Sequence, residues 1–306
     1  MNIYIKKILV VGDSILDKYY YGEVERISPE APIPINHVLK IKNKLGGAAN
    51  VANNLQKLNC QVSIITHIGN DKNGIDLLKE FNGIKVIPFY SNQPTTTKIR
   101  IIGNNQQMLR LDFEEQLQIE NENIIINQIK ENIRDKDAVI ISDYGKGFCT
   151  RNICQSIIKS NKLVIIDPKG EDWSKYKNAS YITPNIKELS DVIGHKVLNN
   201  DSNIRLKALT LIEQFNLTGL LVTRSEKGLS IISKNKVDHL LAKEKEVRDV
   251  TGCGDTALAM FTVAKANGIN DKEAAHLANL AAGITVTKVG TYCPLLSEVL
   301  KGIEKW

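Results

Sequence analysis

Short apolar runs alternate with amphipathic stretches along most of the chain. The runs at 8–11, 138–141, 163–166, 181–182 and 220–222 are each followed by polar residues. This alternation predicts an α/β fold with a mostly parallel sheet and helices on both faces. Ligands of such sheets bind outside the carboxyl ends of the strands. We therefore expect one site lined by the residues that end these runs: Asp13, Asp143, Asp167, Thr183 and Thr223.

Two segments depart from this pattern and predict a small β lid. Residues 18–35 contain three prolines, which exclude a helix and favour extended chain. Residues 95–113 alternate between apolar and polar positions around Gly103-Asn104-Asn105, as a hairpin does. We expect a single domain, 1–306, with a lid from about 15–45 and 95–113. Such a lid excludes water from a reaction at the sheet edge; a solvated edge hairpin is the alternative.

Two further stretches place polar residues on predicted helices. Gly46 and Gly47 precede an apolar helical pattern, and Asn50 lies in its first turn, where a ligand approaches backbone N–H groups. A second long helix, 272–288, is apolar apart from Asn279, for which a hydrogen-bonded core amide is the simplest interpretation.

The stretch 249–255, which leads into the apolar run 256–264, has the strongest chemical pattern. Gly252 and Gly254 permit a tight turn, and the helix N-terminus that follows attracts anions. Asp255 in the same turn favours phosphoryl transfer: Gly252, Cys253 and Gly254 stabilise the transferred group, and Asp255 takes a proton from the attacking hydroxyl. A simple helix-terminal charge is an alternative. A dinucleotide fingerprint is another, but no hydrophobic strand leads into it.

A second pair, Asn185 and Glu188, places an amide and a carboxylate three residues apart at a helix start. Such a pair holds Mg²⁺-bound water near nucleotide phosphates, because Mg²⁺ keeps several of its waters. The sequence contains no Gly-x-x-x-x-Gly-Lys-Ser/Thr motif, which excludes P-loop NTPases.

Composition narrows the class of protein. The chain has 306 residues, 42% of them hydrophobic, and a net charge of +6 from 40 basic and 34 acidic residues. The dispersed basic residues argue against nucleic acid and suit small anionic substrates. Five cysteines without a C-x-x-C pattern indicate reduced thiols. No signal peptide and no membrane-length apolar run is visible, so we expect a cytoplasmic enzyme without membrane contact.

Residues 46–50 and 249–255 together resemble the paired signatures of the ribokinase-like (PfkB) sugar kinases, and the resemblance extends over essentially the full chain. It implies a Rossmann-like domain with a small β lid, ATP and Mg²⁺ as cofactors, and transfer of the γ-phosphoryl group to a sugar hydroxyl. Asp255 then matches the base and residues 252–254 the anion hole. The resemblance implies sugar contacts from Asp13, Gly46, Gly47 and Asn50; nucleotide contacts from Asn185, Glu188, Thr223, Ser225, Gly228 and Asn279; water-mediated Mg²⁺ binding at Glu188; and a monovalent cation such as K⁺ at Asp249 and Thr251.

Within the family, several stretches are similar to kinases of D-glycero-β-D-manno-heptose 7-phosphate, which act on the anomeric hydroxyl and supply ADP-heptose for lipopolysaccharide. These stretches are 11–13, 26–34, 95–98, 105–107, 110–113, 142–147, 167–170 and 223–228. We expect Gln107 to contact the substrate. The phosphate of the substrate is expected to bind one or two of Lys98, Arg110, Lys146 and Lys169, with Arg110 as a bidentate ligand. We expect two copies of the chain to form a homodimer through the lid. A kinase of another sugar, and a non-catalytic sugar or nucleotide sensor, are the alternatives.

Two features depart from the family pattern. Cys253 stands where alanine is usual, which adds an oxidisable group beside the transferred phosphate. Many family members carry a fused adenylyltransferase domain, whereas this sequence ends at Trp306, so we expect a separate protein to supply that step.

Overall fold

The computed structural model describes residues 3–242, 247–288 and 290–303, and its central element is a nine-stranded sheet. The strand order is β13-β12-β11-β10-β9-β8-β1-β4-β5; the strands from β11 to β5 are parallel, and β12 pairs antiparallel with both β11 and β13. The strands are β1 (Lys7–Gly12), β4 (Gln61–Gly69), β5 (Lys85–Ser91), β8 (Ala138–Ser142), β9 (Leu163–Asp167), β10 (Tyr181–Ile182), β11 (Gly219–Thr223), β12 (Leu229–Ser233) and β13 (Val237–Leu240).

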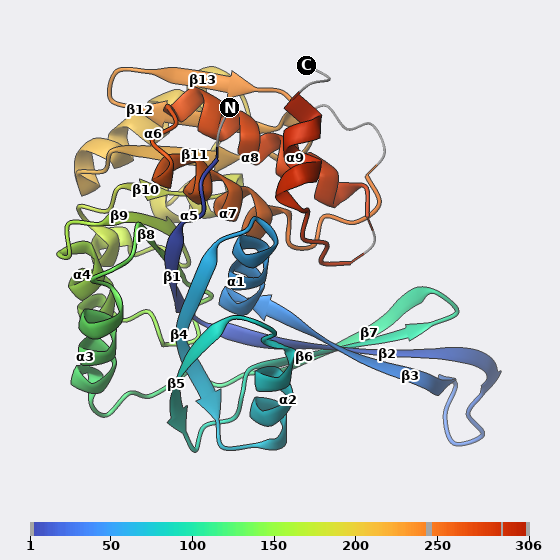
Figure 1. The fold of residues 1–306 in the computed structure, drawn as a ribbon. Helices are drawn as coiled ribbons and strands as arrows, with labels where there is room; N and C mark the ends of the chain where they lie inside the picture. The colour runs from blue at the N-terminus through green and yellow to red at the C-terminus, as the bar shows by residue number, and fades with distance from the viewer. Residues whose placement is uncertain (1–2, 243–246, 289, 304–306) are drawn as a thin grey trace.

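Helices cover both faces of this sheet, because its strands are apolar on both sides (Figure 1). In β1, Ile8 and Val10 join one core and Leu9 and Val11 the other. The first core takes in α1 (Ala48–Lys57), α2 (Lys72–Glu80), α7 (Cys253–Ala266), α8 (Asp271–Val286) and α9 (Leu296–Ile303). The second takes in α3 (Glu122–Asn132), α4 (Arg151–Ile158), α5 (Ile186–Ile193) and α6 (Asp201–Phe215). The predicted fold class is confirmed.

A second, four-stranded sheet projects from the body (Figure 1). We call it the small sheet: β3 (Pro34–Gly47), β2 (Ser14–Ile27), β6 (Thr97–Gly103) and β7 (Gln106–Phe113), in that order. The predicted hairpin is present, since β6 and β7 pair antiparallel around Asn104 and Asn105, whose φ values of 49° and 65° fit a tight hairpin turn. The proline-containing segment 28–33 joins β2 to β3, and β3 is an edge strand.

The parallel register brings the strand ends together at one edge, as expected. Gly12 pairs with Ser142, and Ser142 pairs with Asp167. Helices α1 and α7 begin at this edge after Gly47 and Gly252, whose φ values of 57° and 80° are accessible mainly to glycine. The edge therefore combines polar strand ends with two helix N-termini.

Across residues 3–242, 247–288 and 290–303, the structure contains no helix with both the length and the apolar character needed to cross a membrane.

Candidate active site

Asp255 lies in the first turn of α7 with its side chain buried and both carboxylate oxygens hydrogen-bonded. The Asn50 amide donates to Oδ2 at 2.6 Å, and the Tyr144 hydroxyl donates to Oδ1 at 2.8 Å. Asn50 comes from the first turn of α1 and Tyr144 from the loop after β8. Three segments distant in the sequence thus hold one carboxylate at the sheet edge.

The surroundings of Asp255 make it a stronger base than an ordinary aspartate. Burial raises its pKa to about 6, although the hydrogen bonds from Asn50 and Tyr144 favour the ionised form. At neutral pH the carboxylate is then mostly ionised and still accepts a proton readily. This combination suits a general base.

The turn before Asp255 offers backbone N–H groups to an anion. Among the described residues, the N–H groups of Gly254 and Asp255 have no hydrogen-bond acceptor, as expected in the first turn of a helix. The Cys253 N–H donates to Val250 O at 3.3 Å, a long bond. A Cβ built on Gly254 meets nothing within 4 Å, so that side is open. Burial raises the pKa of the Cys253 thiol to about 12, which keeps it protonated and weakly reactive.

Asp13 organises the loop that carries Tyr144. Its carboxylate accepts hydrogen bonds from the backbone N–H groups of Tyr144, Lys146 and Phe148 at 2.8, 3.2 and 3.2 Å. The pKa of Asp13 is raised to about 6, mainly by burial and secondly by the charge of Asp143. All of these contacts are internal, so sugar binding by Asp13 stays a prediction.

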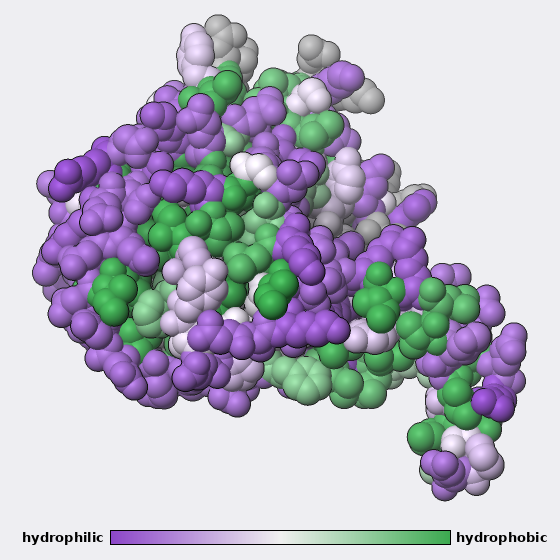
Figure 2. All heavy atoms as spheres, turned by 60° about the horizontal axis from the view of Figure 1, so that its bottom comes forward, coloured by the Kyte–Doolittle hydropathy of each residue, from purple (hydrophilic) through white to green (hydrophobic). Residues whose placement is uncertain are grey.

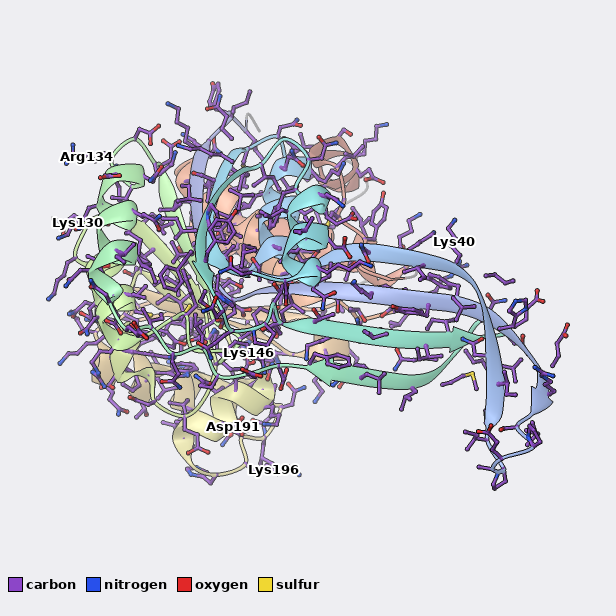
Figure 3. All side chains as sticks on the ribbon, turned by 90° about the horizontal axis from the view of Figure 1, so that it is seen from below. Lys40, Lys130, Arg134, Lys146, Asp191 and Lys196 are labelled. Atoms are coloured by element: carbon purple, nitrogen blue, oxygen red, sulfur yellow. The ribbon has the colours of Figure 1, made fainter. Side chains whose placement is uncertain are left out.

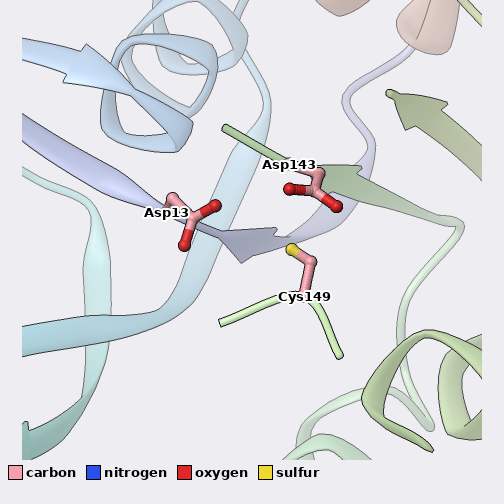
Figure 4. A group of neighbouring side chains, drawn as sticks. All are labelled: Asp13, Asp143 and Cys149. Carbon is pink, nitrogen blue, oxygen red and sulfur yellow. The ribbon is translucent and has the colours of Figure 1, made fainter. Parts of the chain in front are cut away.

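Asp13, Asp143 and Cys149 form a buried group whose atoms are close enough to share a metal ion (Figure 4). The carboxylate oxygens of Asp143 accept from the Gly145 N–H at 2.7 Å, from Lys175 Nζ at 2.5 Å and from a tyrosine hydroxyl at 2.6 Å. With these N–H and O–H donors already directed at both carboxylates, the group is an internal ion-pair network and does not fit a cation.

The predicted nucleotide side of the site lies in the same cleft as Asp255. A cleft of about 190 Å³ is lined by Asp143, Tyr144, Asp167, Pro168, Lys169, Thr183, Asn185, Glu188, Thr223, Gly252, Gly254 and Asp255. Asn185 and Glu188 form a capping box at the start of α5, with reciprocal hydrogen bonds of 2.9 and 3.1 Å. Lys169 Nζ lies 3.4 Å from Glu188 Oε1, which places Lys169 beside the nucleotide residues.

Acidic side chains outnumber basic ones in the lining of this cleft. Burial, then the charges of Asp255 and Glu188, raise the pKa of Asp167 well above its usual value. Lys169 is the only cation among the residues that line the cleft, against several carboxylates. A divalent cation therefore fits, because the phosphates of ATP would otherwise meet like charge.

Ser225, Gly228 and Asn279 are not among the residues that line this cleft. A Cβ on Gly228 would come within 2.1 Å of Leu240 O, so close packing requires this glycine. The Asn279 amide donates to Leu241 O at 2.8 Å, which is the internal bond of a core amide. Ser225 opens a 3-10 turn at 225–227. Nucleotide binding by these three residues stays a prediction.

The two glycines before α1 are explained by packing. A Cβ on Gly46 would lie 2.5 Å from Asp17 Oδ2, and one on Gly47 would lie 2.4 Å from Asp13 O. Asp17 is a buried residue of β2 that sequence reasoning missed; Arg100 NH1 lies 2.5 Å from its Oδ1. The charge of Asp17 contributes to the raised pKa of Asp255, after the effect of burial, so Asp17 belongs to the electrostatic surroundings of the active site.

The basic residues expected to bind a substrate phosphate are all paired with carboxylates. Lys98 lies 3.0 Å from Asp112, Arg110 lies 2.8 Å from Asp112, and Lys146 lies 2.7 Å from Glu114. Lys146 is found where the small sheet meets the body (Figure 3). Arg110 and Gln107 are exposed on the edge strand β7 and do not line the Asp255 cleft. Phosphate and substrate binding by these side chains therefore stays a prediction.

Asp249 and Thr251, the predicted cation pair, form the turn before α7. Asp249 accepts from the Thr251 N–H at 2.9 Å and from the Gly290 N–H at 2.8 Å. Burial opposes ionisation of Asp249, but these hydrogen bonds and Lys44 outweigh it and lower its pKa. The carboxylate is thus ionised and tied to the segment after α8.

Tyr144 and Asp17 are the site residues that sequence reasoning did not identify. Tyr144 lies within 142–147, which the family resemblance singled out without a role for the tyrosine. Asp17 falls in a stretch that reads only as extended chain. Neither contact has a local sequence signal, because both partners lie far away along the chain.

Comparison with known proteins agrees with this geometry. Residues 5–297 match the family model described as pfkB family carbohydrate kinase. The bifunctional protein HldE of Actinobacillus succinogenes is 42% identical over 293 residues, which cover 93% of this chain and 61% of that protein. The chain thus spans about three-fifths of the length of this relative.

Solved structures share the fold. Ribokinase from Thermotoga maritima superposes with a TM-score of 0.75 at 22% identity, covering 98% of this chain and 100% of that one. Phosphofructokinase-2 from Escherichia coli in complex with potassium has a TM-score of 0.83 at 16% identity, covering 97% and 98%. This chain belongs to the pfkB family of carbohydrate kinases and is a phosphotransferase that acts on a sugar hydroxyl.

Proposed function

We propose that this kinase transfers the γ-phosphoryl group of ATP to the anomeric hydroxyl of D-glycero-D-manno-heptose 7-phosphate, giving the 1,7-bisphosphate for ADP-heptose and lipopolysaccharide synthesis. The observation that carries the catalytic part is the buried Asp255 carboxylate beside the free N–H groups of the α7 N-terminus. The choice of acceptor is supported by the likeness to heptose 7-phosphate kinases and by the HldE relative.

In the proposed reaction Asp255 takes the proton of the sugar hydroxyl as its oxygen attacks the γ-phosphorus. The new oxygen–phosphorus bond forms while the bond to the β-phosphate oxygen breaks, and ADP leaves. The charge on the phosphoryl oxygens is stabilised by the N–H groups of residues 252–254 and by the helix dipole of α7. Asn50 and Tyr144 hold the carboxylate of Asp255 in place.

We assign the Mg²⁺ of the nucleotide to the acidic side of the cleft. Glu188 would hold it through water, with Asp167 as a second carboxylate. When bound, Mg²⁺ offsets the charge of the ATP phosphates. Asp249 and Thr251 are the proposed site of a monovalent cation, which the potassium complex of phosphofructokinase-2 supports by analogy.

The small sheet is proposed to act as a lid on a single catalytic domain, 1–306, and to join two copies of the chain. One of its faces carries the cross-strand row Ile41, Tyr20, Ile101 and Leu109. Ile41 and Leu109 are more than half exposed, and hydrophobic residues are visible along this arm (Figure 2). An apolar sheet face of this kind favours a second sheet as its partner.

Light scattering with size-exclusion chromatography tests the dimer. We expect a particle of twice 34.1 kDa for the unmodified chain and a monomer for Leu109→Lys. Ile124→Lys, an equally exposed position on α3, is the control and is expected to stay dimeric. A monomeric unmodified chain would overturn this assignment.

Product analysis tests the reaction itself. The protein is incubated with Mg·ATP and either heptose 7-phosphate, fructose 6-phosphate or ribose, and the product is identified by mass and phosphorus NMR. Asp255→Asn is expected to fold and bind ATP but to lose at least ~100-fold in turnover. A preference for ribose or fructose 6-phosphate would contradict the proposed acceptor. Full turnover by Asp255→Asn would show that Asp255 is not the general base.

A further inference from the structure

The two faces of the small sheet differ in chemistry. Residues paired across neighbouring strands project on the same side of a sheet. The face opposite to the apolar one carries two neighbouring cross-strand rows. One contains Lys42, Tyr19, Arg100 and Arg110, and the next, nearer the body, contains Lys44, Asp17, Lys98 and Asp112. One face is therefore apolar and the other is predominantly basic.

The basic face looks toward the active site. The charge of Asp17, which belongs to this face, contributes to the raised pKa of Asp255. Lys44 Nζ lies 2.7 Å from the position that a Cβ on Gly290 would occupy, and the Gly290 N–H donates to Asp249 at 2.8 Å. Asp249 begins the turn that leads to Asp255. The Lys44 side chain therefore extends from the small sheet to the segment that contacts the turn before the catalytic base.

Lys42 and Lys44 differ from the other cations of this face in their partners. Arg100, Arg110 and Lys98 each have a carboxylate within 3.0 Å. Within the described part of the chain, no carboxylate lies within 4.0 Å of either Lys42 or Lys44.

Aromatic rings hold the two ammonium groups in place. Lys44 Nζ lies 5.2 Å from the ring centre of Tyr19, and Lys42 Nζ lies 5.7 Å from that of Tyr21. The two rings stack with centres 6.0 Å apart. The pKa of Lys44 is lowered, mainly by burial and secondly by the charge of Lys42. Asp17 and Asp249 act in the opposite direction, but neither comes within ion-pair distance of Lys44. Two like charges held close together repel each other, and an anion bound between them would relieve this repulsion.

We propose that Lys44, with Lys42 beside it, binds the phosphate group that the sugar substrate already carries. This inference rests on the proposed function, and it moves the phosphate site from the paired residues Arg110 and Lys169 to the base of β3. The acceptor then extends from its reacting hydroxyl at Asp255 to its phosphate at Lys44. The pair sets specificity for phosphorylated sugars over unphosphorylated ones.

Steady-state kinetics on matched acceptors test this site. Lys44→Gln removes the charge and shortens the side chain by one atom; Lys40→Gln makes the same change farther out on the same strand (Figure 3) and is the control. At saturating Mg·ATP, we expect Lys44→Gln to raise KM for a sugar phosphate at least about tenfold. KM for the unphosphorylated sugar and for ATP should change less than twofold, and Lys40→Gln should behave like the unmodified enzyme.

Inorganic phosphate separates this proposal from the identity of the sugar. Inorganic phosphate should raise the thermal unfolding temperature of the unmodified enzyme, and it should compete with sugar phosphates for binding. This protection should be lost in Lys44→Gln. If heptose 7-phosphate is not turned over but protection still depends on Lys44, the proposed function fails and the phosphate site stands. Equal losses on both acceptors, or no change in KM, would overturn the site.

Discussion

Tyr144→Phe removes one hydroxyl and leaves the ring, which isolates the effect of a single hydrogen bond on the catalytic base. The lost bond is the 2.8 Å contact with Asp255 Oδ1. A hydrogen bond to a charged group contributes roughly 1.5–3 kcal/mol, and about 1.4 kcal/mol corresponds to a change of about 1 in pKa. Because the bond favours the ionised carboxylate, its removal moves the pKa of Asp255 from about 6 to about 7–8.

This shift predicts a defect that depends on pH. With a pKa of about 6, about nine-tenths of Asp255 is ionised at pH 7; with a pKa of about 7.5, about one quarter is. We therefore expect kcat/KM to fall about fourfold at pH 7 and about 15-fold at pH 6, and to approach the unmodified value near pH 9. The acid limb of the profile moves to higher pH.

The assay is release of ADP, measured from pH 5.5 to 9.5 with sugar and ATP varied. Tyr181→Phe is the matched control, because the Tyr181 hydroxyl also donates to a carboxylate, Asp271, at 2.7 Å, and Tyr181 does not line the cleft. A loss of equal size at every pH would mean that Tyr144 does not tune Asp255. An unchanged profile would mean that the hydrogen bond contributes nothing to the ionised form.

Two further changes separate stability from activity at the same turn. Since the pKa of Asp255 is raised from 3.8 to about 6, its contribution to folding is full below pH 3.8 and is lost as the pH rises through 6. In thermal unfolding, Asp255→Asn should therefore be more stable than the unmodified chain by up to about 3 kcal/mol at pH 8 and by little at pH 4; a constant difference would contradict this. Gly254→Ala has open space for its methyl group, so the free energy of unfolding should stay the same or rise by about 1 kcal/mol. The turnover of Gly254→Ala should fall at least about tenfold, because the methyl group occupies the side open to the phosphoryl group. Unchanged turnover would contradict the assignment of the anion hole to this turn.

The fold was largely predictable from the sequence because it depends on local patterns. Apolar runs and their polar ends determine strands, and the parallel register then brings Asp13, Asp143 and Asp167 to one edge without further information. The hairpin at 97–113 follows from alternation and from two asparagines that tolerate positive φ.

The environment of each side chain was not predictable in this way. Arg110 looked like a phosphate ligand by residue type, yet Asp112, two positions away, holds it in a bidentate ion pair. Asn185 and Glu188 matched a family pattern, and the structure shows that they also cap a helix. Residue type indicates which interactions are possible, whereas three-dimensional neighbours decide which ones form.

The basicity of Asp255 shows why such neighbours matter for function. Burial raises the pKa of the Cys293 thiol to about 12, so the thiol stays protonated and donates a hydrogen bond to Asn50 Oδ1 at 3.7 Å. With its oxygen occupied in this way, the Asn50 amide turns its NH₂ group to Asp255 at 2.6 Å. The orientation of the amide, and through it the ionisation of the base, thus depends on a cysteine 243 positions away. A motif locates the base, but its strength is set by this chain of contacts between α1, α7 and the segment after α8.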